Sequence, residues 1–499
     1  MADVARRAPL ILALAAAVLA ASPAPAESPA GQGPTAPVVA EAVVLTGLWQ
    51  YEGTYALDED RSVDILAHEG RLYAVIDEVK HPLTEQGGDV FATAEGEAFT
   101  FYRLGPLVRG FTRDGERHER RTRLMNPESR DLLTPRPARF WRADRLYAYQ
   151  APENIEDGVG MGEAAPFTLE PAVVERIVRG VEDGTWPEVH AVLVSRRDRL
   201  VMEEYFYGYH RERPHPMREL TEGVIAMAVG AAIEARMIPG ADAAVAPYMR
   251  YRGRRREDPR REKITLAHLL SMRSGVDCDD ARPGSAVNAA SFFDSEDWGR
   301  TFMQAPMVAE PGAKAARCTA GVIVAGRVVE RASQKRMRQV AGEHLFRPLG
   351  IDSDDFRWPF LLARKQAHQR GEVWLRPRHM MKLGLMLKDD GRWLGKPVLS
   401  EEWVQGMTGR YGVVDGEPFG FGVRHRTYEV ATDAGPVKIE TLLMHGDGGQ
   451  NIWVVRDLDL VVVTTGGAYG AAEAPADRLL AEVILPAILN ADKSARPNS

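Results

Sequence analysis

The sequence has only two cysteines, Cys278 and Cys318, among its 499 residues. Two cysteines allow at most one disulfide within the chain, and in an oxidising compartment an even pair can form it. Their spacing matches neither a zinc-binding motif nor a redox motif. We therefore expect no metal and no cofactor.

A strong charge of one sign is missing as well. The formal net charge is −7, from 63 basic and 70 acidic residues, which argues against nucleic acid as the main partner. With 45% hydrophobic and 27% charged residues, the composition is that of a globular chain long enough for two domains or more.

Long apolar runs are scarce, and the one that comes near the length of a membrane span lies at the N-terminus. Arg6 and Arg7 precede an apolar run from Ala8 to Ala21, and the small residues Ala24-Pro25-Ala26 follow. This order predicts a secretory signal peptide over residues 1–26. A retained anchor is the alternative, although the run is short for a span. We expect a periplasmic or secreted mature protein with no transmembrane segment.

Short β-type runs dominate residues 45–138. Runs such as Arg71 to Ile76 and Ala98 to Tyr102 are separated by glycine and aspartate turns, which predicts a small all-β barrel or sandwich. Residues 27–44, rich in proline, alanine and glycine, are expected to be a flexible leader. Residues 139–164 are expected to be a linker, 165–490 a large domain, and 491–499 a tail.

The large domain contains one unusual stretch, His215-Pro-Met-Arg-Glu-Leu-Thr-Glu222, followed by an apolar segment. Between Val224 and Ile233, only Gly230 is not plainly hydrophobic. A helix that is apolar on all sides is buried in the middle of a domain. Groups at its N-terminus would occupy a deep site of positive potential, because the first backbone N–H groups of a helix lack partners.

This stretch resembles a segment of the serine β-lactamase, penicillin-binding protein and class C esterase superfamily. In that superfamily, Ser-x-x-Lys stands on the first turn of the central helix, often after Pro-Met-Arg. Aligned on Pro216-Met217-Arg218, the serine position is Glu219 and the lysine position is Glu222. The resemblance covers residues 165–490. It implies an α+β, β-lactamase/transpeptidase-like fold: an antiparallel sheet flanked by helices with a helical subdomain, here preceded by the small all-β domain.

Further segments carry the same resemblance. Ile264 to Asp277 is similar to a family segment and predicts a helix with Thr265 as N-cap and Gly275 as C-cap. The family's Tyr-x-Asn or Tyr-x-Ser motif falls on Arg317-Cys318-Thr319, and its Lys-Thr-Gly or His-x-Gly strand falls on His445-Gly446-Asp447-Gly448. The hairpin that follows, 451–455 with 460–465, is expected at the edge of the sheet.

The all-β region has a resemblance of its own. The rhythm Tyr51-x-Gly-x-Tyr, followed by Gly70-x-Leu-Tyr, is similar to a lipocalin-like accessory domain that some β-lactamase-like proteins carry. Such a barrel either binds a ligand or serves as a packing module, and we favour the packing module.

The resemblance assigns catalytic positions, but most of them hold other residue types. In the family, the serine attacks a carbonyl, lysine and tyrosine move its proton, and backbone N–H groups stabilise the oxyanion. The corresponding positions here are Glu219, Glu222, Arg317, Thr319 and His445, with Gly446, Asp447 and Gly448 lining the ligand cleft. Glu219 cannot form the usual acyl-ester, and neither a displaced Ser-x-x-Lys nor a Gly-x-Ser-x-Gly elbow is present.

Three functional hypotheses remain. The first is a non-catalytic homologue that serves as a binding or structural protein of the cell envelope, with a small-molecule or peptidoglycan-like ligand in the cleft. The second is a hydrolase that uses Glu219 and Glu222 as an acid/base pair near His445, or that holds a metal on these three side chains. The third is an active serine hydrolase of the esterase, amidase or β-lactamase type whose nucleophile lies elsewhere. The oligomeric state is left open.

Two contacts are expected from the resemblance. The loops that carry Cys278 and Cys318 border the cleft in the resembled fold, so these cysteines are predicted to form a disulfide. Glu222 and Arg317 occupy facing motif positions with opposite charges, so they are predicted to form an ion pair, with Glu219 as a second acceptor for the guanidinium.

Overall fold

The structure is a computed structural model of the whole chain. It describes residues 47–57, 61–76, 79–94, 96–122, 127–138, 147–162, 169–249, 258–293, 295–358, 360–363, 366–369, 372–432, 435–471 and 474–494. The predicted signal peptide and leader lie outside these ranges. Within them, no helix combines the length and the apolar character needed to cross a membrane.

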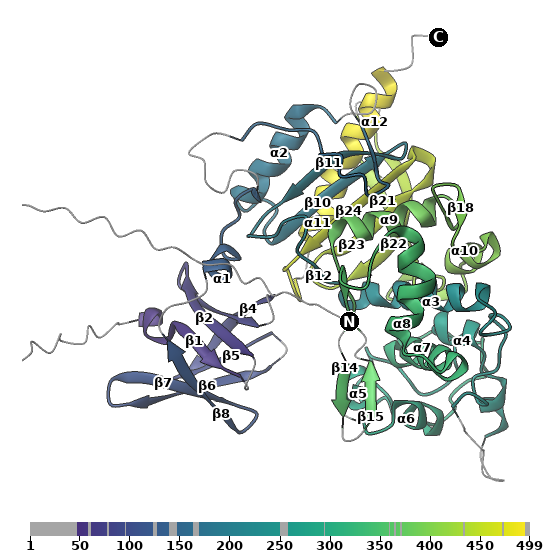
Figure 1. Ribbon diagram of the computed structural model, residues 1–499, viewed down its shortest axis with the longest axis horizontal. Helices are drawn as coiled ribbons and strands as arrows, with labels where there is room; N and C mark the ends of the chain where they lie inside the picture. The colour runs from purple at the N-terminus through teal and green to yellow at the C-terminus, as the bar shows by residue number, and fades with distance from the viewer. Residues whose placement is uncertain are drawn as a thin grey trace, which may run out of the picture. The chain divides into compact units, whose positions relative to one another are not determined.

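Eight antiparallel strands close into a barrel in the N-terminal part of the chain (Figure 1). Each strand pairs with the next, and β1 pairs with β8 to close the barrel. The strands are β1 (Gly53–Ala56), β2 (Ser62–His68), β3 (Arg71–Ile76), β4 (Val79–Gly87), β5 (Val90–Ala92), β6 (Ala98–Leu104), β7 (Leu107–Arg113) and β8 (Glu116–Thr122). The predicted all-β domain is therefore confirmed, as a barrel.

Aromatic side chains make up much of the buried core of the barrel. The rings of Tyr51, Phe91, Phe99, Phe101 and Phe111 are buried and contact one another. An eight-stranded barrel is just wide enough to be filled by its own side chains or to hold one small ligand. The choice of a packing module over a ligand-binding barrel therefore stays a prediction.

A nine-stranded sheet forms the centre of the large domain, in the order β19-β20-β21-β22-β23-β24-β10-β11-β9. Its strands are β9 (Gly160–Met161), β10 (Val189–Arg196), β11 (Arg199–Tyr205), β19 (Gly412–Val414), β20 (Glu417–Phe419), β21 (Arg424–Val430), β22 (Val437–Gly446), β23 (Gln450–Val455) and β24 (Leu460–Gly466). The short strand β9 runs parallel to β11, whereas the other pairs are antiparallel. The sheet is therefore mixed rather than purely antiparallel as expected.

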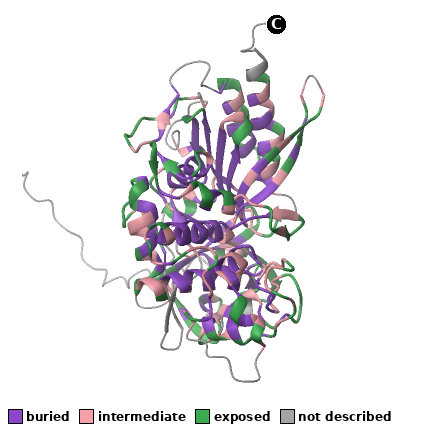
Figure 2. Ribbon diagram, turned by 90° about the vertical axis from the view of Figure 1, so that its right-hand side faces the viewer, coloured by how far each residue is buried: buried purple, intermediate pink, exposed green. Residues whose placement is uncertain are grey.

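The hairpin of β23 and β24 lies inside the sheet, so the prediction that it forms an edge was wrong. β23 pairs with β22, and β24 pairs with β10. Every residue of both strands is buried, as Figure 2 shows for the interior strands of this sheet. Strands that are buried on both faces have near-continuous apolar runs such as Leu460 to Val463, and this pattern marks a central position.

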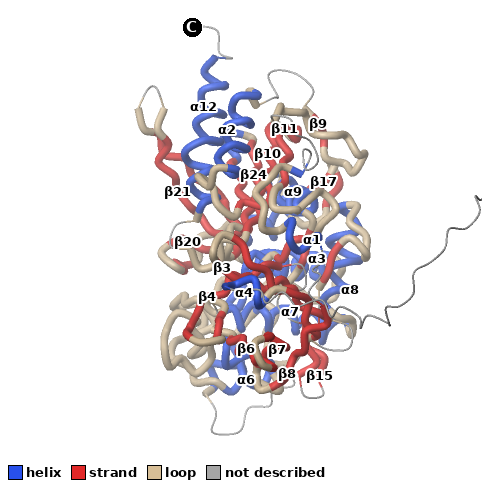
Figure 3. Tube along the Cα trace, turned by 90° about the vertical axis from the view of Figure 1, so that its left-hand side faces the viewer, coloured by secondary structure: helices blue, strands red, loops and turns tan. Residues whose placement is uncertain are grey.

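Helices cover both faces of the sheet (Figure 3). Val192, Val194 and Val462 pack with helices α2 (Pro171–Glu182), α11 (Pro475–Leu479) and α12 (Leu485–Ser494). The alternate residues Ala191, Leu193 and Val463 belong to the core that also contains α9 (Pro377–Lys388) and α3 (Thr221–Glu234). The two-residue period of the strands therefore divides their side chains between two cores.

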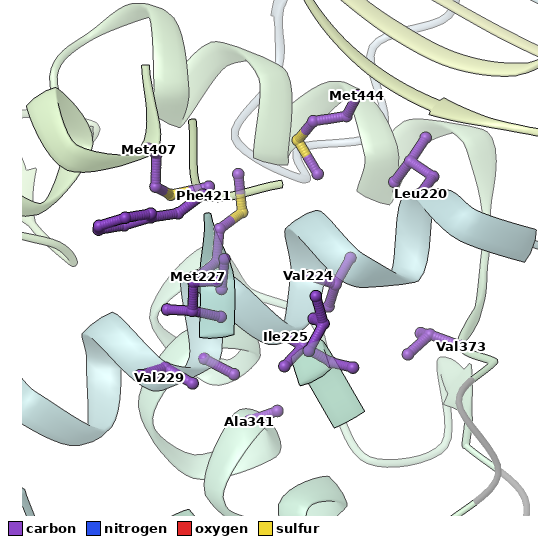
Figure 4. Close-up of a cluster of buried hydrophobic side chains, with 14 of the residues drawn as sticks. Leu220, Val224, Ile225, Met227, Val229, Ala341, Val373, Met407, Phe421 and Met444 are labelled. Carbon is purple, nitrogen blue, oxygen red and sulfur yellow. The ribbon is translucent and has the colours of Figure 1, made fainter. Parts of the chain in front are cut away.

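Helix α3 is buried from Thr221 to Ala232, as its all-round apolar sequence predicts. Figure 4 shows Met407, Phe421 and Met444 on one side of this helix and Ala341 on another. The other helices of the helical subdomain are α4 (Leu266–Leu270), α5 (Ala289–Phe293), α6 (Trp298–Gln304), α7 (Thr319–Ser333), α8 (Met337–Ala341) and α10 (Glu401–Met407). The α+β architecture implied by the resemblance is confirmed.

Of the two caps predicted for the helix after Ile264, the N-cap is confirmed and the C-cap was wrong. The Thr265 hydroxyl accepts the backbone N–H of His268, so Thr265 is the N-cap of α4. The helix ends at Leu270, with Ser271 as C-cap, so Gly275 does not cap it. Gly275 has φ +76°, and a Cβ there would lie 2.4 Å from the carbonyl oxygen of Ala309. Glycine is required at this position by the close approach of another backbone segment.

Candidate functional site

The N-terminus of α3 lies against the end of strand β22. A Cβ on Gly446 would lie 2.4 Å from the carbonyl oxygen of Met217 and 3.1 Å from the backbone nitrogen of Glu219, so only glycine fits. Arg218, directly before Glu219, has φ +50°. A left-handed backbone is uncommon for a non-glycine residue and often marks a constrained functional turn. Local packing and backbone geometry therefore fix the position of Glu219.

The Glu219 carboxylate is held by backbone N–H groups. Oε2 accepts the N–H of Asp447 at 2.8 Å. Burial alone would raise the pKa of this carboxyl. Donation by backbone N–H groups, with the nearby cations Arg218 and Arg317, outweighs burial and holds the pKa below its usual range. Glu219 is therefore ionised at neutral pH.

Glu222, one helical turn further on, is deeper and has different partners. Its Oε1 accepts hydrogen bonds from the Arg317 guanidinium at 3.3 Å and from the Thr319 hydroxyl at 3.0 Å. Burial raises the pKa of Glu222, and the charge of Glu219 adds to this rise, against the opposing effects of Arg317 and Thr319. The predicted pair of Glu222 and Arg317 is confirmed.

The prediction that Glu219 is the second acceptor for Arg317 was wrong. Nη1 of Arg317 lies 3.2 Å from Oδ2 of Asp415. In the described part of the chain, Arg317 forms ion pairs with Glu222 and Asp415 but not with Glu219. The physical reason is that the Glu219 carboxylate already accepts the backbone N–H of Asp447. Asp415, in a hairpin turn, contacts Arg317 instead.

A disulfide joins Cys278 and Cys318, with their Cα atoms 5.4 Å apart, as predicted. Two hydrogen bonds of 2.8 Å flank it, from the N–H of Asp280 to the carbonyl of Arg317 and from the N–H of Thr319 to Oδ2 of Asp280. The disulfide therefore fixes the segment whose residues on either side of Cys318 bind Glu222.

Residues that the sequence motifs did not indicate face this segment from the sheet. Asp415 and Gly416 form the two-residue turn between β19 and β20, with φ +52° and +84°. Oδ2 of Asp415 contacts Arg424 at 2.8 Å as well as Arg317, and Glu417 contacts both Arg424 and Arg426. The Asp-Gly dipeptide between short β-type runs is a hairpin signal that would have located Asp415.

A cavity of about 390 Å³ opens among these groups. It is lined by Glu219, Arg317, Asp415, Gly416, Glu417, Arg424, Arg426, His445 and Asp447. None of these lining residues is a serine, a cysteine or a lysine. The cavity therefore joins four of the predicted site residues, Glu219, Arg317, His445 and Asp447, in a strongly charged cleft that lacks the usual nucleophile.

His445 and Asp447 are both held by local hydrogen bonds. Nδ1 of His445 lies 2.7 Å from Oδ1 of Asn451 on the neighbouring strand. Asp447 accepts the backbone N–H groups of Gly448 and Gly470. Gly448 has φ +89°, and a Cβ there would lie 2.5 Å from the Tyr469 ring, so it packs against that ring.

In the part of the chain that the structure describes, no three His, Cys, Asp or Glu side chains form a group that could hold a metal ion. The hypothesis of a metal on Glu219, Glu222 and His445 is not supported.

Comparison with known proteins extends the resemblance. Residues 175–484 match the family described as Beta-lactamase. No curated protein matches the chain significantly.

Among solved structures, a candidate β-lactamase from Bacteroides dorei is 17% identical, with a TM-score of 0.50, over 64% of this chain and 100% of that one. A family VIII carboxylesterase is 16% identical, with a TM-score of 0.49, over 66% of this chain and 99% of that one. An octameric penicillin-binding protein homologue from Pyrococcus abyssi is 15% identical, with a TM-score of 0.48, over 64% of this chain and 77% of that one. At 17% identity, the likeness to the Bacteroides dorei protein is one of fold.

Proposed function

The chain belongs to the β-lactamase family, and from this we propose that it is a member without acyl-enzyme chemistry, whose cleft binds a ligand and does not turn it over. The observation that carries the proposal is the Glu219 carboxylate. It stands at the family's serine position and accepts the backbone N–H of Asp447 at 2.8 Å. Backbone N–H groups in such a place would stabilise the oxyanion of an acyl-transfer reaction. Here a side chain of the protein already occupies them.

The position of the proton-transfer residue supports the same conclusion. Glu222 stands where the family has lysine, and its Oε1 is already shared by Arg317 and Thr319. A nucleophile needs an adjacent base to become reactive. Because Glu219 offers no hydroxyl, no alcohol stands one turn before Glu222 to be activated.

We place this binding protein in the cell envelope. Residues 1–26 have the pattern of a secretory signal peptide, and Cys278 and Cys318 form a disulfide, which persists in oxidising compartments. A small-molecule or peptidoglycan-like ligand is consistent with a cleft of about 390 Å³.

A second candidate function is favoured by one contact. The Thr319 hydroxyl donates to Glu222 at 3.0 Å, which is the distance expected between a nucleophile and its base. Thr319 would then be the alcohol of an active hydrolase. We rank this second, because Thr319 is not among the residues that line the cavity and Glu222 is also bound to Arg317.

Covalent labelling separates the two. We expect neither a fluorophosphonate nor a penicillin probe to add mass to the purified protein, and we expect no appreciable turnover of short-chain esters. Glu219→Ser alone should remain unlabelled, because nucleophile and base act as a unit. The informative variant combines Glu219→Ser, Glu222→Lys and Arg317→Tyr. Labelling of the unmodified protein that maps to Thr319 would establish the second candidate, and labelling at any serine would show that the nucleophile lies elsewhere.

A further inference from the structure

The carboxylates that line the cleft divide into two sets. Asp415 and Glu417 are bound to arginine side chains, with Asp415 contacting Arg317 at 3.2 Å and Arg424 at 2.8 Å. Glu219 and Asp447 form no ion pair with a lysine or arginine in the described part of the chain. These two carboxylates are therefore not in direct contact with a cation, although the charge of Arg218 acts on both and that of Arg317 acts on Glu219.

Backbone N–H groups hold these two carboxylates but do not cancel their charges. Glu219 accepts from the N–H of Asp447, and Asp447 accepts from Gly448 at 2.9 Å and from Gly470 at 3.0 Å. A backbone N–H contributes a dipole and no net charge. Each ionised carboxylate has about four lone-pair positions, so both keep acceptor capacity toward the cavity.

The arginines of the same cavity are bound directly to other carboxylates. Arg317 is bound to Glu222 and Asp415, Arg424 to Asp415 and Glu417, and Arg426 to Glu417 and to Asp477 at 2.6 Å. Each guanidinium therefore contacts two carboxylates. An anionic ligand would have to displace one of these internal carboxylates before it could bind an arginine.

His445 contributes a third acceptor. Nδ2 of Asn451 donates to the Thr464 hydroxyl at 3.2 Å, which fixes the orientation of the amide and leaves its Oδ1 to accept from Nδ1 of His445. When Nδ1 carries the proton of a neutral imidazole, Nε2 has a free lone pair. The ring lines the same cavity as Glu219 and Asp447.

We propose that the ligand of this cleft carries a primary ammonium group, which Glu219, Asp447 and Nε2 of His445 receive. The inference rests on the proposed binding function and names the ligand class of that site. An ammonium has three N–H donors and no acceptor, so it matches three acceptors that, in the described part of the chain, no lysine or arginine contacts directly. Unlike a metal ion, it does not require ligand atoms at about 2.0–2.6 Å.

A matched series of ligands tests the charge requirement. We would titrate the full-length mature protein with pentylamine, pentanol and pentanoate by calorimetry at neutral pH and low salt. Pentylamine should bind at least about tenfold more tightly than either of the others, because hydrogen bonds to charged groups are the strong ones. Its affinity should fall as the salt concentration rises. Equal affinities across the series, or no binding of pentylamine, would overturn the inference.

Two nearly isosteric variants test the site. Glu219→Gln and Asp447→Asn keep an acceptor oxygen for the backbone N–H groups but remove the charge, and each should weaken pentylamine binding about tenfold or more. The matched control is Glu429→Gln, which removes the same charge at an exposed position of β21 and should leave binding unchanged. If all three variants bind alike, the ammonium does not lie between Glu219 and Asp447. Covalent labelling at Thr319 or at a serine would contradict the proposed function and would leave this binding result untouched.

Discussion

Glu219 and Glu222 stand three positions apart, yet their pKa values move in opposite directions. Both side chains are desolvated, and desolvation raises the pKa of a carboxyl. At Glu219 backbone N–H donation and the charges of Arg218 and Arg317 reverse this effect, whereas at Glu222 burial prevails over one guanidinium and one hydroxyl. Because the shifts depend on tertiary partners, the sequence could place both glutamates in the site but could not assign either protonation state.

The first prediction concerns the charge of Glu219. The pKa of Glu219 in the folded protein lies below its value of about 4.3 in the unfolded chain. The ionised carboxylate therefore stabilises the fold. This stabilisation is complete above the unfolded pKa and is lost as the pH falls through the folded pKa. Glu219→Gln should therefore lower the free energy of unfolding near neutral pH, and the difference from the unmodified protein should disappear in acid. Urea unfolding at several pH values measures this, with Glu429→Gln as control. A difference that stays constant from neutral pH to acid would contradict the assignment.

The second prediction concerns Arg317, whose side chain is 14% exposed next to that of Glu222 at 8%. Arg317→Met should lower the free energy of unfolding by about 3–5 kcal/mol, because it leaves a buried carboxylate without its partner. Arg317→Met combined with Glu222→Leu should recover much of this loss. The control is Arg410→Met, since the pair of Arg410 and Glu440 is about half exposed and should contribute less than about 1 kcal/mol. Losses that simply add in the double variant would exclude a coupled pair.

At the scale of elements, α3 is the best predicted part of the molecule. Its sequence is apolar all round, and such a helix can only be buried, so burial followed from the residues. The hairpin of β23 and β24 was placed wrongly because β24 pairs with β10, which lies far earlier in the sequence, whereas β22 directly precedes β23. Local patterns determine strand identity, whereas strand order depends on long-range pairing.

The third prediction uses two glycines in buried helices. A Cβ on Gly230 of α3 would lie 2.3 Å from Nε1 of Trp403, which donates to the carbonyl of Ala226. Gly230→Ala should therefore lower the free energy of unfolding by about 1–3 kcal/mol through overpacking. On α7, a Cβ on Gly326 would lie 3.8 Å from Ile225, which is ordinary contact. Gly326→Ala should be neutral or stabilise by up to about 1 kcal/mol. Equal effects of both substitutions on the free energy of unfolding would show that helix propensity, and not the contact with Trp403, determines the change.

The fourth prediction concerns the disulfide, which closes a loop with a sequence separation of 40. In the chain-entropy description, a loop of this length stabilises the fold by about 4 kcal/mol. Cys278→Ala with Cys318→Ala should lower the free energy of unfolding by that order, and mass spectrometry of non-reduced peptides should recover the linked pair. Because the chain has only these two cysteines, a reductant should not alter the stability of the double variant. Free thiols in protein prepared from an oxidising compartment would contradict the link.

At the scale of the whole molecule, the fold and the site differ in how far the sequence predicts them. Segments such as Ile264 to Asp277 and His445 to Gly448 indicate the fold even though the serine and lysine of the family are missing. The cleft depends on Asp415, Glu417, Arg424 and Arg426, which lie outside those motifs. Pairing of β20 with β21 brings these four residues together, and Asp415 contacts Arg317. Charge networks of this kind leave no periodic pattern in the sequence, so only the three-dimensional arrangement reveals them.

Because a backbone N–H group binds the Glu219 carboxylate, any ligand that needs the same N–H group must compete with Glu219. A carboxylate on a short covalent tether has an effective local concentration in the millimolar range or above. A free oxyanion or a boronic acid that seeks the same N–H groups must outcompete this resident group, and at micromolar concentration it does not. The protein should therefore be insensitive to inhibitors that imitate a tetrahedral intermediate, whatever other ligand enters the cleft.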